Sequence, residues 1–324
     1  MKKQLLLSFL AGLVLPLVLA AAFQKGPAAE DVESDGLSPT QASAPVDGAV
    51  SLTVKNRAGN LQQMTLEEYL VGVVLAEMPA DFEPEALKAQ AVVARTYTRR
   101  RMGGGKHELA AVCMDSGCCQ GFRSPEEYLE AGGQQKSVDR VRSAVAATDG
   151  LVLEYEGELI DATYFSCSGG ITEDAVAVWG RDVPYLKSVE SPGEEEAPRY
   201  RDSVSFSAAE FAGKLGLQAD GDPADWFGAV TRTAGDGVET MVIRDRSFTG
   251  TQLRSKLGLR STAFEIRVSG NTVTVSTRGF GHRVGMSQYG AQAMAGEGST
   301  CAEILAHYYS GTELVHHPSE YYGN

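Results

Sequence analysis

Residues 65–97 read TLEEYLVGVVLAEMPADFEPEALKAQAVVARTY and contain two helical patterns with a break between them. The stretch opens with a capping-box pattern, and apolar residues then recur at helical spacing until Met78-Pro79, where the proline ends the helix. Pro84 is a favoured first-turn residue for a second helix, which continues with apolar residues on one broad face as far as Gly103. The stretch therefore predicts two successive helices, one from about Leu66 to Ala76 and one from about Pro84.

Outward from this stretch, further helical patterns alternate with strand patterns. β-Branched and aromatic residues flank the turn Glu156-Gly157-Glu158, which indicates a hairpin. We expect helices at Ser137–Thr148, near Ser207–Glu210, from about Ser287 and after Thr300, and strands at Leu151–Tyr155, Leu159–Phe165 and Thr272–Ser276. The predicted fold class is α+β, with mixed helices and antiparallel strands around a substrate groove and with an inserted smaller subdomain.

The start of the chain predicts export. Two lysines precede an apolar run from Leu5 to Phe23, which is long enough to cross a hydrocarbon core of about 30 Å as a helix. Basic residues in front of such a run place the N-terminus in the cytoplasm and the rest outside. A cleaved signal peptide is the alternative, because Leu19–Ala22 would suit a cleavage site. Both interpretations export the folded part.

Composition gives the expected domain organisation. The predicted parts are a signal-anchor or transmembrane helix (1–24), a flexible linker rich in small and acidic residues (25–48), a first part of the core (49–189), an acidic, loop-rich insertion (190–250) and a second part of the core (251–324). The formal net charge of -13 argues against a nucleic-acid partner, whose phosphates require a basic face.

Cysteine usage indicates a metal site. Five cysteines are an odd number for an exported chain, and three of them lie in one short loop. That loop offers four soft ligands within thirteen residues, which is enough for a structural tetrahedral zinc site; the ligands are His107, Cys113, Cys118 and Cys119. A disulfide between Cys113 and Cys118 is the competing interpretation. We expect Cys167 and Cys301 to be buried thiols, and His316-His317 to lie in a tail.

Glu77 is the strongest catalytic candidate. It follows an apolar helix directly before Met78-Pro79, where the helix dipole and apolar neighbours both disfavour the charged carboxylate and raise the pKa. A carboxyl group with a raised pKa can protonate a leaving oxygen at neutral pH. A solvated charge at a helix end is the plainer interpretation. Arg95 either orients this acid and lowers its pKa or pairs structurally elsewhere.

Two turns add candidate ligand-binding groups. Gly279–Gly285 follows a strand and precedes a helix, so its glycines permit positive φ and close approach of a ligand. His282 in this turn and Ser287-Gln288 at the start of the helix could bind sugar hydroxyls, or act as a packing residue and an N-cap. Ser166 and Ser168 lie in a second turn, which could line the same groove or be an ordinary turn.

Four segments in order resemble the stage II sporulation protein D family, which are lytic transglycosylases that thin peptidoglycan during engulfment of the forespore. The segments are the Glu77 stretch, Tyr164–Gly170 with Glu173 and Trp179-Gly180, Arg254–Phe264, and Gly279–Ala291. The resemblance runs from about Leu52 to Leu314. It implies that Glu77 is the catalytic acid and base. The predicted substrate-binding residues are Gln90, Arg95, Tyr97, Ser166, Ser168, His282, Met286, Ser287, Gln288 and Tyr289.

The resemblance implies a cellular setting as well. It suggests cleavage between N-acetylmuramic acid and N-acetylglucosamine with 1,6-anhydro ends, a preference for strands without stem peptides, and a single-pass location in the mother-cell engulfing membrane. The implied partners are the amidase stage II sporulation protein P and the membrane scaffold protein M.

Clostridial members carry zinc in the cysteine loop, with a second histidine where this chain has Cys118. The family usually has glycine at the position of Arg283, so this cation either alters the turn or faces the substrate. A non-catalytic amidase enhancer and a water-using muramidase are the alternatives.

Overall fold

The computed structural model describes residues 46–318. The predicted anchor and most of the predicted linker lie outside the described residues. Among residues 46–318, no helix has both the length and the apolar character needed to span a membrane.

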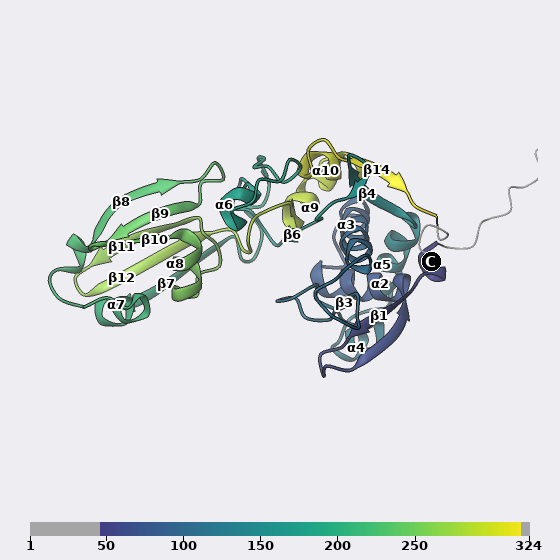
Figure 1. Cartoon of the computed structure of the whole chain (residues 1–324), viewed down its shortest axis with the longest axis horizontal. Coiled ribbons are helices and arrows are strands. Elements are labelled where there is room, and N and C mark those ends of the chain that lie inside the picture. Colours follow the sequence, from purple (N-terminus) through teal and green to yellow (C-terminus); the bar gives the residue numbers. More distant parts are fainter. Residues whose placement is uncertain (1–45, 319–324) are drawn as a thin grey trace, which may run out of the picture. The chain divides into compact units, whose positions relative to one another are not determined.

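Helices and antiparallel strands alternate in the described part, which confirms a mixed α+β fold (Figure 1). The helices are α1 (Val46–Ala49), α2 (Leu66–Glu77), α3 (Pro84–Met102), α4 (Pro125–Glu130), α5 (Gln135–Ala147), α6 (Ala175–Trp179), α7 (Ala208–Leu215), α8 (Gly250–Leu257), α9 (Gln288–Gly296) and α10 (Cys301–Tyr308), with a 3-10 turn at Pro223–Trp226. The strands are β1 (Ser51–Lys55), β2 (Leu61–Thr65), β3 (Val112–Cys113), β4 (Leu151–Tyr155), β5 (Glu158–Leu159), β6 (Tyr164–Phe165), β7 (Arg201–Ser207), β8 (Phe227–Arg232), β9 (Val238–Ile243), β10 (Arg246–Thr249), β11 (Phe264–Ser269), β12 (Thr272–Arg278), β13 (Met286–Ser287) and β14 (Glu313–His316).

The strands form several small sheets rather than one large one. Their orders are β2-β1-β3, β10-β9-β8, β11-β12-β7, β13-β6 and β14-β4-β5. Two of the pairings are parallel, β1 with β3 and β6 with β13, and the others are antiparallel.

Two large hydrophobic clusters and one small one, around Cys167, Ala197 and Tyr200, hold the described elements together. The first is built on α2 and α3, which pack with α5, α9, α10 and β4. The second runs from Phe206 to Val275 and joins α7 and α8 to the sheets β11-β12-β7 and β10-β9-β8. The boundaries predicted for the insertion stay a prediction.

Local signals placed the helices well. Capping boxes form at Thr65, Ser207 and Thr300, so α2, α7 and α10 begin where the sequence predicted. Ser287 accepts a hydrogen bond from the Gly290 N–H and caps α9. Because α2 continues one residue past the predicted end, Glu77 is its last residue.

Two expectations about strands were wrong. The predicted second hairpin strand, Leu159–Phe165, is divided: β5 pairs with β4, whereas β6 leaves the hairpin and pairs with β13. His316 does not lie in a tail. It is the last residue of β14, which pairs antiparallel with β4. His317 is buried and lies 2.6 Å from the carboxylate of Glu154.

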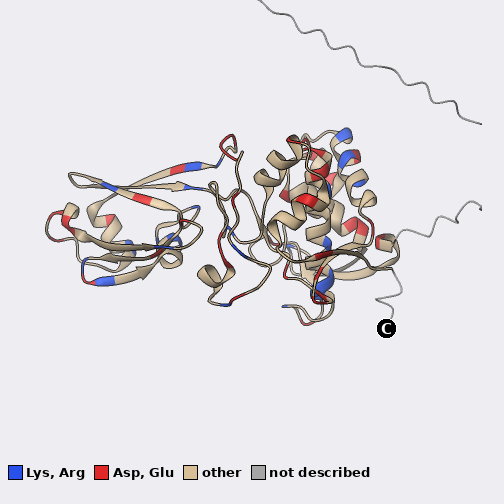
Figure 2. Cartoon of the chain, turned by 90° about the horizontal axis from the view of Figure 1, so that it is seen from above, with Lys and Arg blue, Asp and Glu red and all other residues tan. Residues whose placement is uncertain are grey.

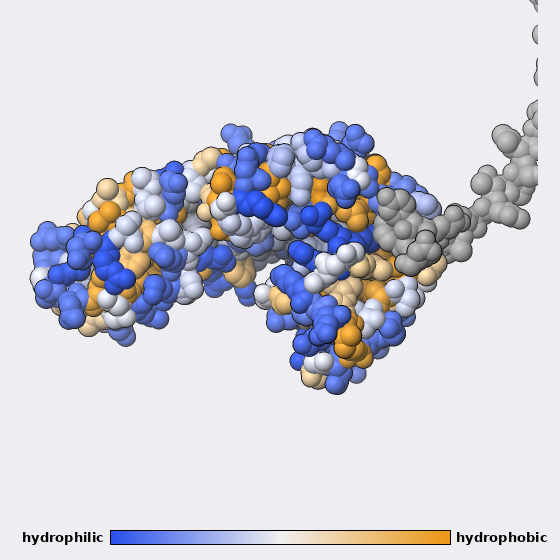
Figure 3. Space-filling view, in the orientation of Figure 1, coloured by the Kyte–Doolittle hydropathy of each residue, from blue (hydrophilic) through white to orange (hydrophobic). Residues whose placement is uncertain are grey.

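Surface character follows the composition. In the view of Figure 2, both acidic and basic residues occur along the helices and strands of the described part. On the face shown in Figure 3, hydrophobic residues form small separate patches among hydrophilic ones.

Candidate active site

A cavity of about 740 Å³ lies at the end of α2. Its volume is in the range of pockets that bind small molecules, and its lining mixes aromatic rings with hydroxyl and amide groups. Segments far apart in the sequence contribute to it: the end of α2, the cysteine loop, the β6 region, the turn before β7 and the glycine-rich turn. The predicted site residues that line it are Glu77, Tyr97, Cys119, Ser166, His282, Gln288 and Tyr289.

Glu77 is half-buried, and its carboxyl group accepts a hydrogen bond from the Gly121 N–H. Burial raises its pKa above the usual range, while the bond from Gly121 and a hydrogen bond with the Tyr164 hydroxyl oppose the rise. A β-carbon at Gly121 would lie 2.8 Å from Glu77 Oε1. The absence of a side chain there therefore lets the backbone reach the carboxyl group.

Buried polar groups fix the wall around Glu77. The Tyr164 hydroxyl donates to Gln120 Oε1 at 3.2 Å, and Gln120 Nε2 donates to Thr98 Oγ1 at 3.0 Å. Burial raises the pKa of Tyr164 well above its ordinary value, so its hydroxyl keeps its proton. Tyr164 and Gln120 were not predicted as site residues, although Tyr164 lies in the second of the four motifs.

His282 is a neutral wall residue. Its Nδ1 accepts a hydrogen bond from the Val284 N–H at 3.1 Å, and its ring lies against Phe165 and Trp179. Burial lowers its pKa to about 4. At neutral pH the imidazole is therefore uncharged and contributes shape and polarity, not a positive charge.

Five predicted substrate-binding residues lie behind the cavity wall instead of lining it. Gln90 is buried, and its Oε1 accepts a hydrogen bond of 3.3 Å from Gln288 Nε2. Arg95 is buried against Asp47 at 2.7 Å and also donates to Val145, Thr148 and Leu151. This is the structural pairing that the sequence left open, and Arg95 is not among the groups that shift the pKa of Glu77.

The other three hold the two turns in place. Ser168 donates from both its backbone N–H and its hydroxyl to Glu194 Oε2, each at 2.8 Å. The Ser287 hydroxyl donates to Oε1 of the same carboxylate. Met286 is buried in β13, where its N–H bonds to the Thr163 carbonyl at 3.1 Å. One buried carboxylate thus ties the Ser166–Gly170 turn to the start of α9.

The glycine-rich turn packs closely against residues 163–168 of the protein. Gly279, Gly281 and Gly285 all have positive φ, as predicted. The groups next to them are the backbone and side chains of residues 163–168, so the missing side chains allow two turns of the protein to meet.

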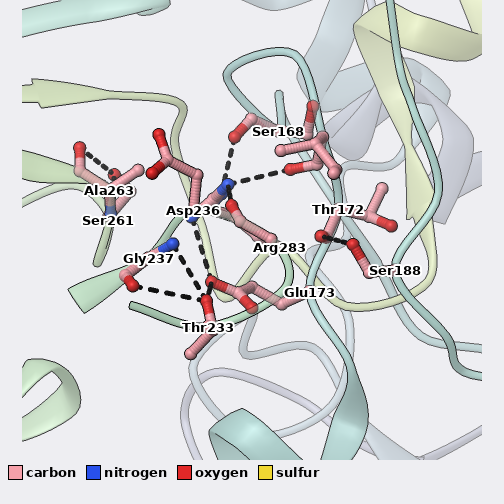
Figure 4. A network of polar contacts seen from close by, with 12 residues as sticks. Ser168, Thr172, Glu173, Ser188, Thr233, Asp236, Gly237, Ser261, Ala263 and Arg283 are labelled. Atoms are coloured by element: carbon pink, nitrogen blue, oxygen red, sulfur yellow. Dashed lines mark hydrogen bonds and ion pairs between the residues drawn. The ribbon is translucent and has the colours of Figure 1, made fainter. Parts of the chain in front are cut away.

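Arg283 also has positive φ, at 69°, and is not among the residues that line the cavity. Figure 4 shows it within a network of polar groups of the protein. Its guanidinium is buried, lies 3.2 Å from the Glu173 carboxylate and donates to the carbonyls of Ser168, Ile171 and Gly235. The Thr233 hydroxyl donates to the same carboxylate at 2.8 Å. Arg283 therefore adopts the positive φ that a glycine would have, and its side chain links the glycine-rich turn to the loop between β8 and β9.

The four predicted metal ligands come together. His107, Cys113, Cys118 and Cys119 each offer a ligand atom within 4.8 Å of the others. A turn in which the N–H groups of Cys118 and Cys119 both bond to the Asp115 carbonyl places the adjacent cysteines side by side. All five cysteines are free thiols, so Cys113 and Cys118 are not joined by a disulfide.

The spacing of these atoms suits zinc. Bond lengths of about 2.3 Å to sulfur and about 2.0 Å to nitrogen give tetrahedral edges of about 3.8 Å between sulfurs and about 3.5 Å between nitrogen and sulfur. The two adjacent Sγ atoms are 4.0 Å apart, and His107 Nε2 lies 3.7 Å and 3.4 Å from them. The donor set therefore fits a closed structural zinc site.

A second cavity adjoins the first. The two share Ala76, Glu77 and Ser116, and the second is also lined by Asp115 and Arg123. Glu77 is thus accessible from both cavities, and Asp115 is the other carboxyl group beside it. Asp115 Oδ1 accepts a hydrogen bond from the Gly117 N–H at 2.8 Å, which closes the turn of the cysteine loop.

Known proteins resemble this chain in sequence. A family model described as SpoIID, Stage II sporulation protein, matches residues 54–155. Proteins named Stage II sporulation protein D from Bacillus amyloliquefaciens and Bacillus subtilis (strain 168) are each 41% identical to this chain. The alignments cover 87% and 95% of this chain and 82% and 94% of those proteins. A Bacillus subtilis (strain 168) protein named Amidase enhancer is 29% identical over 76% of this chain and 40% of its own length.

The matches define the class as stage II sporulation proteins. At 41% identity over most of both chains, this chain belongs to the stage II sporulation protein D family, which confirms the prediction from its four motifs.

Proposed function

We propose that this chain is a lytic transglycosylase that cuts peptidoglycan glycan strands between N-acetylmuramic acid and N-acetylglucosamine. The protonated Glu77 carboxyl donates its proton to the bridging oxygen, and the bond from that oxygen to C1 of the muramic sugar breaks. The resulting Glu77 carboxylate then takes the proton of the muramic 6-hydroxyl, whose oxygen bonds to C1. The products are a 1,6-anhydromuramyl end and a free 4-hydroxyl, and Glu77 regains its proton.

The observation that carries this proposal is the setting of Glu77. It is the one carboxyl group lining the larger cavity in the described part of the chain, and burial raises its pKa. A raised pKa extends to higher pH the range in which a carboxyl group stays protonated, as a general acid must be. A glycosidase that uses water needs a second carboxyl group to activate that water or to act as nucleophile, whereas attack by the sugar's own hydroxyl does not.

We assign zinc a structural role beside this acid. His107, Cys113, Cys118 and Cys119 would hold the ion, and it would fix the loop that carries Gly121. Cys119 and Gln120 line the same cavity as Glu77, and Gly121 donates to Glu77 two residues after the last ligand. Metal loss would therefore loosen the hydrogen bond to the acid.

In the cell, we propose that residues 1–24 anchor the chain in the mother-cell membrane with the folded part outside. There it would thin septal peptidoglycan during engulfment. Family membership also suggests that it acts on strands without stem peptides, together with the amidase stage II sporulation protein P and the membrane protein M. Crosslinking in engulfing cells followed by capture of this chain tests these partners, and recovery of neither protein would remove them.

The test of the activity compares two carboxyl groups. The full chain in mild detergent, its Glu77→Gln variant and its Asp115→Asn variant are incubated with stem-peptide-free glycan strands. We expect Glu77→Gln to lose at least about 100-fold in rate, in line with the loss of a general acid, and Asp115→Asn to keep its rate. Full activity of Glu77→Gln would refute the assignment of the acid.

Two other functions have specific support. The relative named Amidase enhancer favours a non-catalytic glycan-binding role, in which wild-type chain binds strands without cutting them. Asp115 in the adjoining cavity favours a water-using muramidase, in which Asp115→Asn also loses activity and the products carry reducing ends.

A further inference from the structure

The larger cavity has one cationic side chain, Arg199. No other arginine and no lysine lines it in the described part of the chain, and His282 is neutral there at pH 7.

Arg199 is exposed and has no carboxylate partner among residues 46–318, in contrast to its neighbour Arg260. Both guanidinium groups lie over the ring of Phe280, at 5.2 Å for Arg199 and 5.4 Å for Arg260. Arg260 is paired with Asp202 at 2.7 Å and does not line the cavity. Of the two, Arg199 is the one whose donors are free for a ligand.

The Phe280 ring holds Arg199 in position. Contact between a guanidinium and a ring face limits the motion of the arginine and leaves its N–H edge open. The ring itself is fixed, because the Phe280 backbone exchanges hydrogen bonds with Cys167, at 2.7 Å and 3.3 Å. The adjacent Gly279 N–H bonds to the carbonyl of Tyr200, the residue after Arg199, at 2.8 Å. The cation and the ring therefore form one preorganised unit.

This unit suits a carboxylate on an otherwise neutral ligand. A guanidinium matches a carboxylate with two parallel hydrogen bonds. The rest of the lining offers hydroxyl, amide and aromatic groups, which suit sugar hydroxyl and acetamido groups. Of the two sugars in a glycan strand, only the muramic sugar has a carboxyl group, on its lactyl ether. That group is an anion when the stem peptide has been removed and an uncharged amide when the peptide is attached.

We infer that Arg199 binds the free lactyl carboxylate of the muramic sugar and thereby selects glycan strands without stem peptides. This inference rests on the proposed function for its substrate class. Beyond the proposed function, it names the residue, Arg199, and the ligand charge, the lactyl carboxylate, that distinguish strands without stem peptides from strands that carry them. Arg199 contacts the ligand away from the reacting atoms, so it determines specificity and leaves bond cleavage to Glu77.

The test changes the charge without adding a peptide. Stem-free strands are compared with the same strands after carbodiimide coupling to ammonia, which converts each lactyl carboxylate into an amide of almost the same size. We expect the full chain to cut the charged strands about tenfold more efficiently in kcat/KM, the scale of one hydrogen-bonded charge pair in a solvent-accessible cavity. The difference lies in KM, because the contact is the same in the ground and transition states.

Variants assign the effect to one residue. Arg199→Ala cuts both kinds of strand at the rate at which wild type cuts the amidated ones, and Arg199→Lys keeps part of the preference. Arg260→Ala is the matched control, because it removes the other guanidinium from Phe280, and it keeps the full preference. Added salt reduces the wild-type preference. If Arg199→Ala keeps the tenfold preference, or if wild type has none, the inference is wrong.

A binding measurement separates this inference from the proposed function. The Glu77→Gln chain and its Glu77→Gln, Arg199→Ala counterpart are titrated with both kinds of strand, labelled with a fluorophore, and anisotropy is recorded. If wild type never cuts but Glu77→Gln prefers charged strands and loses the preference with Arg199→Ala, the lytic activity is refuted and the role of Arg199 stands. Equal binding of both strands by Glu77→Gln refutes the role of Arg199 even if cleavage occurs.

Discussion

Gly121→Ala tests whether the hydrogen bond to Glu77 positions the acid. The new β-carbon would lie 2.8 Å from Glu77 Oε1 and 3.4 Å from its Cδ. The carboxyl group is the end of a flexible side chain, so it would move away by roughly 1 Å and lose the bond from the Gly121 N–H. A displacement of this size at a reacting group costs about 100-fold in rate, or about 2.7 kcal/mol of transition-state stabilisation.

The fold itself should tolerate this change. Gly121 does not have positive φ. Replacing such a glycine with alanine stabilises the fold by about 0.4–1 kcal/mol, because the unfolded chain then has less conformational entropy. This gain offsets the contact with Glu77, so we expect the free energy of unfolding to stay within about 1 kcal/mol of wild type. Gly213→Ala in α7 is the control, because nothing lies within 4 Å of the new β-carbon. It should be slightly more stable and fully active.

The assay combines kcat on stem-free strands with urea unfolding at several pH values. The bond from Gly121 lowers the pKa of Glu77, so its loss raises that pKa further. Since the protonated form is the active one, the rate falls as pH rises through this pKa, and the falling limb moves to higher pH in the variant. Wild-type kcat together with an unshifted limb would refute the reasoning.

Other changes test single elements of the structure. Arg95→Met leaves buried Asp47 with Arg99, at 3.3 Å, as its remaining cationic partner and should cost about 3 kcal/mol in urea unfolding while kcat of the folded fraction stays unchanged; a lowered kcat would restore Arg95 to the site. Arg283→Gly removes the cation from buried Glu173 and should destabilise by a similar amount, even though glycine fits the positive φ; an unchanged midpoint would contradict this. Chelation should release about one zinc per chain by elemental analysis, lower the melting temperature and reduce kcat, and a zinc content near zero would remove the metal. Glu77→Gln should raise the melting temperature near pH 7 and lose this advantage at pH values below the ordinary carboxyl pKa, because a raised folded-state pKa destabilises the fold as pH rises; an advantage that persists in acid would show another cause.

Features set by neighbouring residues were predicted best. Capping boxes, the Met78-Pro79 stop and the glycines of the Gly279–Gly285 turn are local signals, and the helices and the turn lie where these signals placed them. The parallel pairing of β6 with β13 joins segments more than 100 residues apart, and no local pattern specifies such a pairing. For this reason the predicted strand Leu159–Phe165 was too long.

The residues that line the larger cavity were predicted only in part, because a local pattern does not specify which side chains a fold turns toward a cavity. Glu77, Tyr97 and Gln288 were identified from motifs, but a motif does not show which of its polar residues face outward. Ser168 and Ser287 belong to motifs and are instead bound to Glu194. Arg199 follows an acidic run, and its place in the cavity depends on Phe280, 81 positions later in the sequence.

The chemistry of the cut end tests the central claim most directly. Stem-free strands are digested by the full chain in water enriched in oxygen-18, and the muramyl ends are examined by mass spectrometry. If Glu77 directs attack by the sugar's own 6-hydroxyl, the ends are lighter than reducing ends by one water and contain no oxygen-18, and the Glu77→Gln chain produces none of them. Reducing ends that contain oxygen-18, or anhydro ends made by Glu77→Gln at the wild-type rate, would contradict the account.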